Sequence, residues 1–326
     1  MLTSVFSDLS YSKMNDLVNT NLYGRTDERF WDNYLKGRPR VPNSFFDRVF
    51  EYHSSHSGCF NTVNDLGAGP GTFSATLASK FRQVILTDPN KETLDVAKRY
   101  LKTTDVSQFQ YYAVSAEEPA LPDASIDMVF ACNALHHTDV DRTVDVIAKQ
   151  LKPGGTFCAA LFYIAVLKDE AAQNIWTRLF ELGVSDTVPK LGEKGRNVLE
   201  ILNSAYDAVP IPERYFEPGA ERVTINAKQG DETFCLAPHA TKHLPKRSRI
   251  GTNDNLLEAQ GDGWYFEADV DQLRVIHSTH PWTTESSVFE PLWEELRALL
   301  DGEKVGAYWI ASRILATRNS QPYSDA

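Results

Sequence analysis

The sequence contains few cysteines and no long apolar run. Its four cysteines include no Cys-x-x-Cys pair, so neither a zinc site nor a disulfide framework is predicted, and a reducing compartment is expected. No stretch approaches the roughly 20 apolar residues that span a bilayer, and the first residues lack the basic and apolar regions of a signal peptide. These absences predict a cytoplasmic protein with no metal and no membrane partner.

The chain also lacks an excess of basic residues. It has 33 Lys and Arg against 44 Asp and Glu, which gives a net charge of −11. A long phosphate polymer would be repelled overall and would need a local basic groove. The 326 residues, of which 42% are hydrophobic, suffice for one large domain or two with a sizeable core. We therefore expect a globular protein with no nucleic-acid partner.

Three glycines at alternate positions follow a short extended stretch that ends in Asp65. Gly67, Gly69 and Gly71 lead into a pattern with helical spacing. Glycine permits positive φ angles and lets a ligand approach the backbone where a Cβ atom would collide. The spacing fits neither phosphate-binding motif, because the residue three after Gly69 is Thr72 and the turn contains no lysine. The turn predicts a ligand site, although a purely structural turn is the alternative.

This Asp-x-Gly-x-Gly-x-Gly turn between a strand and a helix resembles the first motif of class I S-adenosylmethionine-dependent methyltransferases. A second match is the Leu-Lys-Pro-Gly-Gly turn that ends at Gly155, between an amphipathic helix and an apolar strand. The chain is most similar to the trans-aconitate methyltransferase-like, or methyltransferase type 11, group. The resemblance implies an α/β fold, with a Rossmann-like seven-stranded sheet that is mostly parallel, an antiparallel last strand, helices on both faces and a substrate-capping insertion.

Changes in pattern along the chain predict four segments. Beyond Phe162 the strand and helix alternation stops, and residues 209–264 are richer in proline, glycine and charge. We expect an N-terminal helical cap at 1–45, a cofactor-binding core at 46–165, a substrate-cap insertion at 166–285, and a last helix and strand at 286–320 that complete the core.

The resemblance implies S-adenosyl-L-methionine as cofactor. Asp88 ends an apolar strand about 20 residues past the turn, where a second strand presents a carboxylate to ribose hydroxyls; a plain helix cap is the alternative, since a proline and a helix follow. The same resemblance places the methionine end at the glycine turn and beside Asn133, and the adenine at the residues after the third strand. The predicted cofactor-binding residues are Asp65, Gly67, Ala68, Gly69, Asp88, Pro89, Ser115, Ala116, Glu117 and Asn133.

His136 and His137 follow the fourth strand, in the loop that faces the methyl-transfer region in the relatives. A histidine could remove a proton from an acceptor hydroxyl or amine, since its reference pKa is near 6.5; an ordinary hydrogen-bonded loop histidine is the alternative. For the substrate we expect aromatic walls and one basic group, again by resemblance. The predicted substrate-binding residues are Tyr23, Tyr34, Arg38, Tyr163 and Trp282.

Two further groups of residues invite a functional interpretation. His53 and His56 are three apart near the end of a predicted helix, but no third ligand is evident, so we expect surface histidines and no metal site. A local basic cluster between His239 and Arg249 either holds an anionic acceptor or is a solvated loop.

These observations predict an S-adenosylmethionine-dependent methyltransferase that acts on a small-molecule acceptor by in-line displacement. O-methylation of a carboxylate or hydroxyl is expected first, and N-methylation second. The alternatives are a methyltransferase-fold enzyme that catalyses a non-methylating reaction in secondary metabolism, or a non-catalytic cofactor-binding partner. A nicotinamide enzyme ranks last, because the glycine spacing does not fit one.

Overall fold

The computed structural model describes residues 28–56, 58–103, 105–187, 192–230, 234–235, 237–280 and 287–320. Its centre is one nine-stranded sheet with the order β3-β2-β1-β4-β5-β9-β6-β7, in which β8 pairs with β9. The strands are β1 (Thr62–Leu66), β2 (Gln83–Asp88), β3 (Phe109–Ala113), β4 (Ile126–Cys132), β5 (Leu151–Leu167), β6 (Glu221–Ile225), β7 (Asn255–Ala259), β8 (Tyr265–Ala268) and β9 (Val305–Thr317).

The sheet is mostly parallel. β1 pairs in parallel with β2 and β4, as do β2 with β3 and β4 with β5. β9 runs antiparallel to β5, β6 and β8. The predicted Rossmann-like sheet with an antiparallel last strand is confirmed, and the sheet is wider than seven strands because β7 and β8 extend it.

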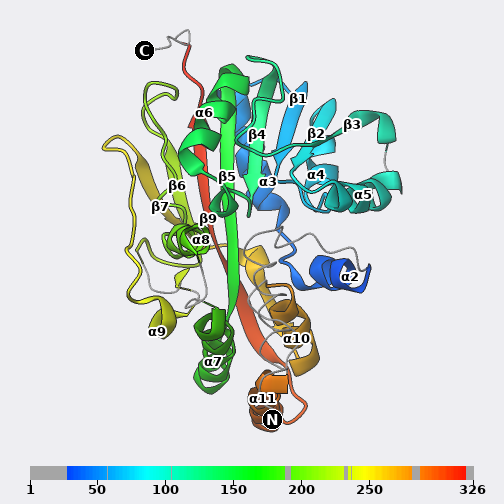
Figure 1. Cartoon of the computed structure of the whole chain (residues 1–326), viewed down its shortest axis with the longest axis vertical. Helices are drawn as coiled ribbons and strands as arrows, with labels where there is room; N and C mark the ends of the chain where they lie inside the picture. Colours follow the sequence, from blue (N-terminus) through cyan, green and yellow to red (C-terminus); the bar gives the residue numbers. More distant parts are fainter. Residues whose placement is uncertain are drawn as a thin grey trace, which may run out of the picture.

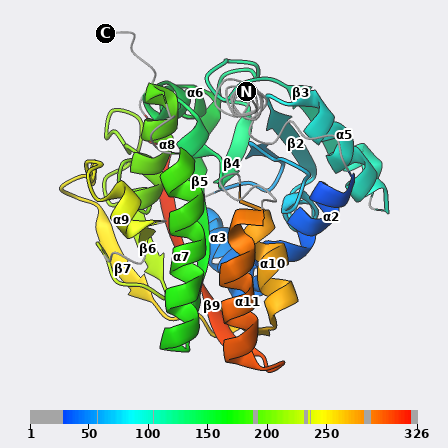
Figure 2. The same cartoon turned by 60° about the horizontal axis from the view of Figure 1, so that its bottom comes forward.

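Helices lie on both faces of this sheet and beyond its end. Figure 1 shows β5 and β9 as long strands that run past the other strands toward α7 and α11. In Figure 2, α7, α10 and α11 lie side by side across this lower part of the molecule. The longer helices are α2 (Glu28–Gly37), α3 (Asn43–Ser55), α5 (Lys91–Tyr100), α6 (Val140–Gln150), α7 (Glu170–Thr187), α8 (Glu193–Asn203), α10 (Val270–Ser278) and α11 (Glu290–Leu300), and the short ones are α4 (Ser74–Ala78) and α9 (Pro238–Thr241).

Local sequence explains where several helices begin. α5 starts after Asn90, whose side chain accepts a hydrogen bond from the backbone N–H of Glu92. α10 starts with a full capping box between Asp269 and Gln272. Such caps satisfy backbone N–H groups that have no partner within the helix. The helix that follows the second strand therefore starts directly beyond the carboxyl end of β2.

Aromatic side chains from α3 join this helix to the sheet. Phe46 packs against Phe130 of β4, and Phe45 packs edge-on against Phe162 of β5. All four rings are buried in the core. Burial of a large apolar side chain contributes about 1.5 to 3 kcal/mol each, so these contacts hold α3 firmly on one face of β4 and β5.

The expectation for His53 is wrong, because its side chain is fully buried. Nδ1 lies 2.8 Å from Thr156 Oγ1 and Nε2 lies 3.1 Å from the carbonyl oxygen of Cys59. Burial lowers the pKa of His53. Both ring nitrogens thus have hydrogen-bond partners, so the ring can be buried beneath α3 as an apolar side chain would be.

The Leu-Lys-Pro-Gly-Gly stretch was expected to be a turn before the fifth strand, and it forms a bulge within the start of β5. Ile126 pairs with Leu151 and Met128 pairs with Thr156, so additional residues on β5 are left over between the two pairs. Gly154 has a φ of 78°, which a glycine adopts without steric cost.

Part of the segment 166–285 belongs to the sheet. β6 pairs with β9 along its whole length, and β7 pairs with β6. The segment's helices lie elsewhere: α7 packs against α11, and α10 packs against α2. Sheet extension and covering helices therefore alternate within this stretch of the chain.

Candidate functional site

The glycine turn joins β1 to α4 at the carboxyl edge of the sheet. The N–H groups of Gly67 and Ala68 both donate to the carbonyl oxygen of Thr87, at 2.8 and 3.1 Å. Gly67 and Gly69 have φ angles of 65° and 55°, which favour glycine. A Cβ on Gly67 would lie 2.5 Å from the Cβ of Ala134, whereas one on Gly69 would meet nothing within 4 Å. Gly67 thus lets the β4 loop approach, and Gly69 faces open space.

Asp65 lies behind this turn rather than in front of it. It is 2% exposed, and Ser74 Oγ donates to its Oδ2 at 2.6 Å. Burial raises the pKa of the Asp65 carboxyl to about 7, opposed by the Ser74 hydrogen bond and assisted by the nearby Asp88. The carboxyl group joins the end of β1 to the first residue of α4, which closes the turn.

Asp88 connects β2 to the same turn. Its Oδ2 accepts from the N–H of Gly69 at 3.0 Å, and its Oδ1 accepts from the N–H of Asn90 at 2.9 Å. Burial raises the pKa of Asp88, and these two N–H groups counteract the rise. A carboxylate has about four lone-pair positions, so two acceptor positions remain beside the open space at Gly69.

The loop after β3 lies next to this acid. The N–H of Val114 donates to the carbonyl oxygen of Asp88 at 3.1 Å. Within the loop, Ser115 Oγ donates to Glu117, whose Oε1 accepts from the N–H of Asp139 at 2.9 Å. The structure therefore brings Ser115, Ala116 and Glu117 to the edge that Asp88 occupies, and Glu117 also fastens the start of α6.

Asn133 begins the loop after β4, with a left-handed φ of 52°. Its side-chain amide donates to the carbonyl oxygen of Phe162 at 3.1 Å and accepts from the N–H of Phe162 at 2.7 Å. This paired contact fastens the loop to β5. The Asn133 side chain is therefore engaged by the Phe162 backbone, and its N–H donates to the carbonyl oxygen of Ala160 at 2.9 Å, so only its carbonyl oxygen has no partner among the described contacts.

His136 and His137 stand on the next turn, with their rings 4.0 Å apart between centroids. His136 is buried and its Nδ1 lies 3.1 Å from the hydroxyl of Tyr206. Burial, His137 and Arg38 together hold the pKa of His136 well below its usual value. Sequence reasoning missed Tyr206, which follows α8 in a part of the chain with no recognisable motif.

Arg38 approaches this loop from the end of α2. It donates to the carbonyl oxygen of Thr279 at 2.9 Å, and its guanidinium lies 4.7 Å from the centre of the Tyr34 ring. Its charge acts on His136, and also on His280 at the end of α10, whose pKa lies well below the usual value because of burial and then Arg38. Arg38, Tyr34 and His136 thus come together from segments about a hundred residues apart.

The remaining predicted substrate residues are placed differently. Tyr163 is buried, its hydroxyl donates to Asn203 of α8 at 3.3 Å, and its ring packs against Phe234. Tyr23 and Trp282 lie outside the described residues.

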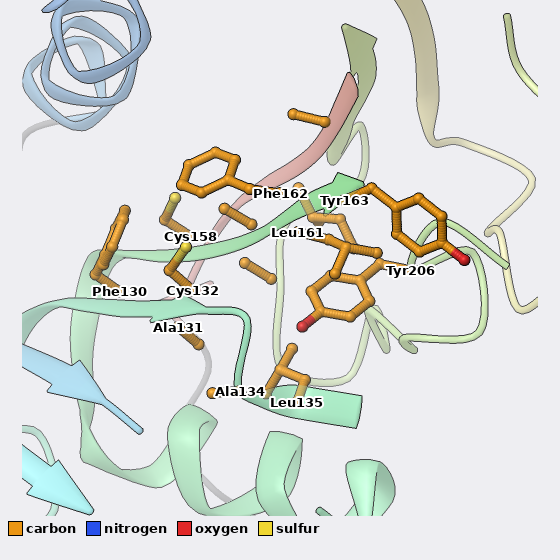
Figure 3. Close-up of a cluster of buried hydrophobic side chains, with 14 of the residues drawn as sticks. Phe130, Ala131, Cys132, Ala134, Leu135, Cys158, Leu161, Phe162, Tyr163 and Tyr206 are labelled. Atoms are coloured by element: carbon orange, nitrogen blue, oxygen red, sulfur yellow. The ribbon is translucent and has the colours of Figure 1, made fainter. Parts of the chain in front are cut away.

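The floor of the region is apolar. Figure 3 shows Phe130, Cys132 and Phe162 on one side of the strand ends and Leu161, Leu135 and Tyr206 on the other, with the Tyr206 hydroxyl directed toward the β4 loop. Burial raises the pKa of the Cys132 thiol well above its usual value, so it remains protonated. These side chains form an apolar layer of the core beside the Tyr206 hydroxyl.

The basic cluster makes ion pairs with other helices. Arg247 lies 2.7 Å from Glu200 of α8, and Arg249 lies 2.7 Å from Asp141 of α6. His239 lies 3.0 Å from Glu181 of α7. These contacts attach His239, Arg247 and Arg249 to three helices.

Within the described ranges, no three His, Cys, Asp or Glu side chains converge as a metal site would require. The helices of the same ranges include none whose length and apolar character would suit a membrane crossing.

Comparison with known proteins identifies relatives along nearly the whole chain. The profile of the family described as "Methyltransferase domain" matches residues 64–159. A protein of Claviceps purpurea named "Methyltransferase" is 36% identical over 296 residues, covering 90% of this chain and 92% of its own. "Methyltransferase AacuQ" of Aspergillus aculeatus is 37% identical, covering 89% and 93%. A structure from Anaeromyxobacter dehalogenans described as a type II methyltransferase has a TM-score of 0.53 at 18% identity, covering 86% of this chain and 97% of its own, which shows a shared fold.

Proposed function

Since the chain belongs to the class I S-adenosylmethionine-dependent methyltransferases, we propose that it transfers the cofactor's methyl group to an oxygen atom of a small organic acceptor. The observation that carries the proposal is the position of Arg38 and His136 beside the loop that follows β4, next to the glycine turn. The cofactor edge and a cationic, partly aromatic region thereby face one another.

The residues at the sheet edge fit S-adenosylmethionine. Open space in front of Gly69 admits a ligand edge, and Asp88 keeps two acceptor positions that suit a pair of ribose hydroxyls. We assign the methionine end to Gly67, Ala68 and Gly69 and the main chain of Asn133. The adenine lies by Ser115, Ala116 and Glu117, and Asp65 and Pro89 shape the turns on either side.

The electrostatics of the acceptor side favour oxygen over nitrogen. Arg38 is a permanent cation. It lies near His136 and His280, which are both buried and neutral. A carboxylate or an acidic hydroxyl gains from this charge, whereas an amine that becomes cationic on methylation is repelled. N-methylation is therefore the less favoured outcome. Tyr34, stacked on Arg38, and Tyr163 supply aromatic walls.

The cofactor supplies an activated methyl group, so the protein's task is chiefly positional. Arg38 orients the acceptor oxygen, the apolar floor of Figure 3 excludes water, and the β4 loop sets the distance between acceptor and cofactor. Alignment of two reactants in this way supplies on the order of 7 to 11 kcal/mol. A carboxylate needs no base, whereas a hydroxyl needs a group that accepts its proton. The helices between residues 166 and 285 cover the acceptor and set its choice.

Calorimetry with S-adenosylhomocysteine tests the cofactor site. Asp88→Ala is expected to weaken binding by at least tenfold, because two ribose hydroxyls lose a charged partner. Asp95→Ala is the control, since that carboxylate makes only exposed contacts to Lys91 and Lys98. Equal affinity of wild type and Asp88→Ala, or no binding at tens of micromolar, contradicts the assignment.

Labelled methyl donor tests the acceptor. The enzyme is incubated with panels of small carboxylic acids, phenols and amines, and the methylated product is identified by mass spectrometry. Base-labile esters or stable ethers are expected. Label that appears only in amines would overturn the preference for oxygen.

A further inference from the structure

Tyr206 is held in an unusual backbone conformation after α8. Its φ is 70°, and that of Ala205 is 52°, both in the left-handed region that non-glycine residues seldom adopt. Arg222 of β6 stabilises this bend by donating to the carbonyl oxygens of Tyr206 and Val209, at 3.3 and 3.0 Å. Arg222 is itself paired with buried Asp254 at 2.6 Å. Such conformations persist where the surroundings impose them, often beside functional sites.

The bend delivers the tyrosine hydroxyl to the loop after β4. The side chain is fully buried, and its oxygen lies 3.1 Å from Nδ1 of His136. His136 Nδ1 is the hydrogen-bond partner that the described contacts give this hydroxyl. Figure 3 shows the hydroxyl pointing at this loop from across the apolar floor.

Burial sets the direction of the hydrogen bond. A tyrosine hydroxyl carries one proton, and a buried donor that has no acceptor costs free energy. Within the described contacts, His136 Nδ1 is the acceptor that this proton reaches. A neutral imidazole that accepts at Nδ1 carries its own proton at Nε2.

We propose that Tyr206 is a positioning residue that fixes His136 as the Nε2–H tautomer, which makes His136 a hydrogen-bond donor beside the acceptor site and not its base. Nδ1 is occupied by the tyrosine proton and Nε2 is already protonated, so neither nitrogen of His136 can take a proton from the acceptor.

The groups around the ring maintain the neutral form. The facing ionisable groups are His137 on the same turn, Arg38 from the end of α2, and Tyr206 from the loop after α8, with Cys132 near the tyrosine. Burial, the Arg38 charge and the adjacent His137 disfavour an imidazolium at His136, and burial keeps the tyrosine protonated. The consequence for catalysis rests on the proposed function, but the tautomer itself does not.

Nuclear magnetic resonance reads the tautomer without any turnover. Long-range proton–nitrogen correlation spectra are recorded on the full chain with ¹⁵N-labelled histidine and bound S-adenosylhomocysteine, and His136→Gln assigns the ring. We expect a protonated Nε2 and an unprotonated Nδ1 from pH 6 to 8. A protonated Nδ1 at neutral pH, alone or with Nε2, would overturn the proposal.

Two tyrosine variants separate the contact from general effects of burial. Tyr206→Phe is expected to shift the His136 Nδ1 signal toward that of a nitrogen with no hydrogen bond. Tyr52→Phe is the matched control, since Tyr52 is also buried and loses one hydrogen bond, from Thr317, far from the loop. An unchanged His136 signal in Tyr206→Phe would reject the assignment. If that variant does not fold, the wild-type spectrum alone decides. Absence of S-adenosylhomocysteine binding would contradict the proposed function and leave the tautomer measurable.

Discussion

At the residue scale, glycine is needed at two positions of one turn for different physical reasons. Both have positive φ angles, but only Gly67 abuts another side chain, while Gly69 borders open space. An alanine at either site pays the left-handed penalty of roughly 1–2 kcal/mol. Only at Gly67 does a steric clash add to it, so the two positions can be distinguished by measurement.

Gly67→Ala is expected to lower the free energy of unfolding by about 1 to 3 kcal/mol more than Gly69→Ala, because its Cβ collides with Ala134. Ala134→Gly in the Gly67→Ala background should recover most of this difference. Chemical denaturation measures all three variants. Gly69→Ala should instead lose affinity for S-adenosylhomocysteine; equal stability of the two single variants would contradict the packing argument.

The raised pKa of Asp65 predicts that the stability of the protein depends on pH. Its folded pKa is about 7, above the unfolded value of about 3.9, so the folded state retains a proton that the unfolded state loses. The contribution of Asp65 to the free energy of unfolding therefore decreases as the pH rises from about 4 to 7, with a slope of up to about 1.4 kcal/mol per pH unit. Above about pH 7 this contribution is constant.

Asp65→Asn should remove this slope while keeping an acceptor for Ser74. Urea denaturation from pH 4.5 to 8 should show the variant gaining stability relative to wild type as the pH increases. Parallel curves for the two proteins would mean that the Asp65 pKa is not raised.

At the element scale, the contact between α2 and α10 positions Arg38. Arg38 donates to the carbonyl oxygen of Thr279 at 2.9 Å. One residue earlier, a Cβ on Gly37 would lie 2.7 Å from the Thr279 methyl group and 2.9 Å from the Val275 carbonyl oxygen. The two helices thus approach at a distance that only glycine allows.

Gly37→Ala is expected to cost about 1 to 3 kcal/mol, because the helices must separate. Gly306→Ala is the control, since its Cβ would meet only the flexible Lys168 side chain at 3.3 Å, and it should change stability by no more than about 0.5 kcal/mol. Thermal and urea denaturation compare the two. A neutral Gly37→Ala would show that α2 and α10 are free to adjust.

At the scale of the whole molecule, a buried ion pair joins β6 to the residues that immediately precede β7. Arg222 and Asp254 have side chains 4% and 6% exposed and lie 2.6 Å apart. The surface pair Arg178 and Glu295 is similar in distance, at 2.7 Å, but each side chain is about half exposed. Water screens the second pair and not the first.

Asp254→Ala is therefore expected to destabilise the protein by about 3 to 5 kcal/mol, because it leaves the Arg222 guanidinium buried and uncompensated. Glu295→Ala should cost no more than about 1 kcal/mol. Urea denaturation measures both, and 0.5 M salt should affect only the second pair. Similar losses in the two variants would mean that Arg222 is reached by water.

Features encoded within about twenty residues were predictable. Turn glycines, strand-end acids and apolar periodicity depend on local backbone preferences and on which residues avoid water. The glycine turn, Asp88, the order of strands and helices, and the antiparallel last strand all belong to this group, and the structure confirms the fold they predicted. The buried position of His53 was missed because a partner on β5 satisfies it.

Contacts between distant segments were decided by the tertiary structure alone. No local pattern indicates that Tyr206 meets His136, that Arg38 meets the end of α10, or that the Asn133 amide pairs with the Phe162 backbone. Burial supplies the physical reason. A polar group removed from water must find whichever partner packing brings within reach, and packing depends on the whole chain. The sequence by itself determined the fold and the residues proposed to bind the cofactor, and folding determined the hydrogen-bond partners of His136, Arg38 and Asn133.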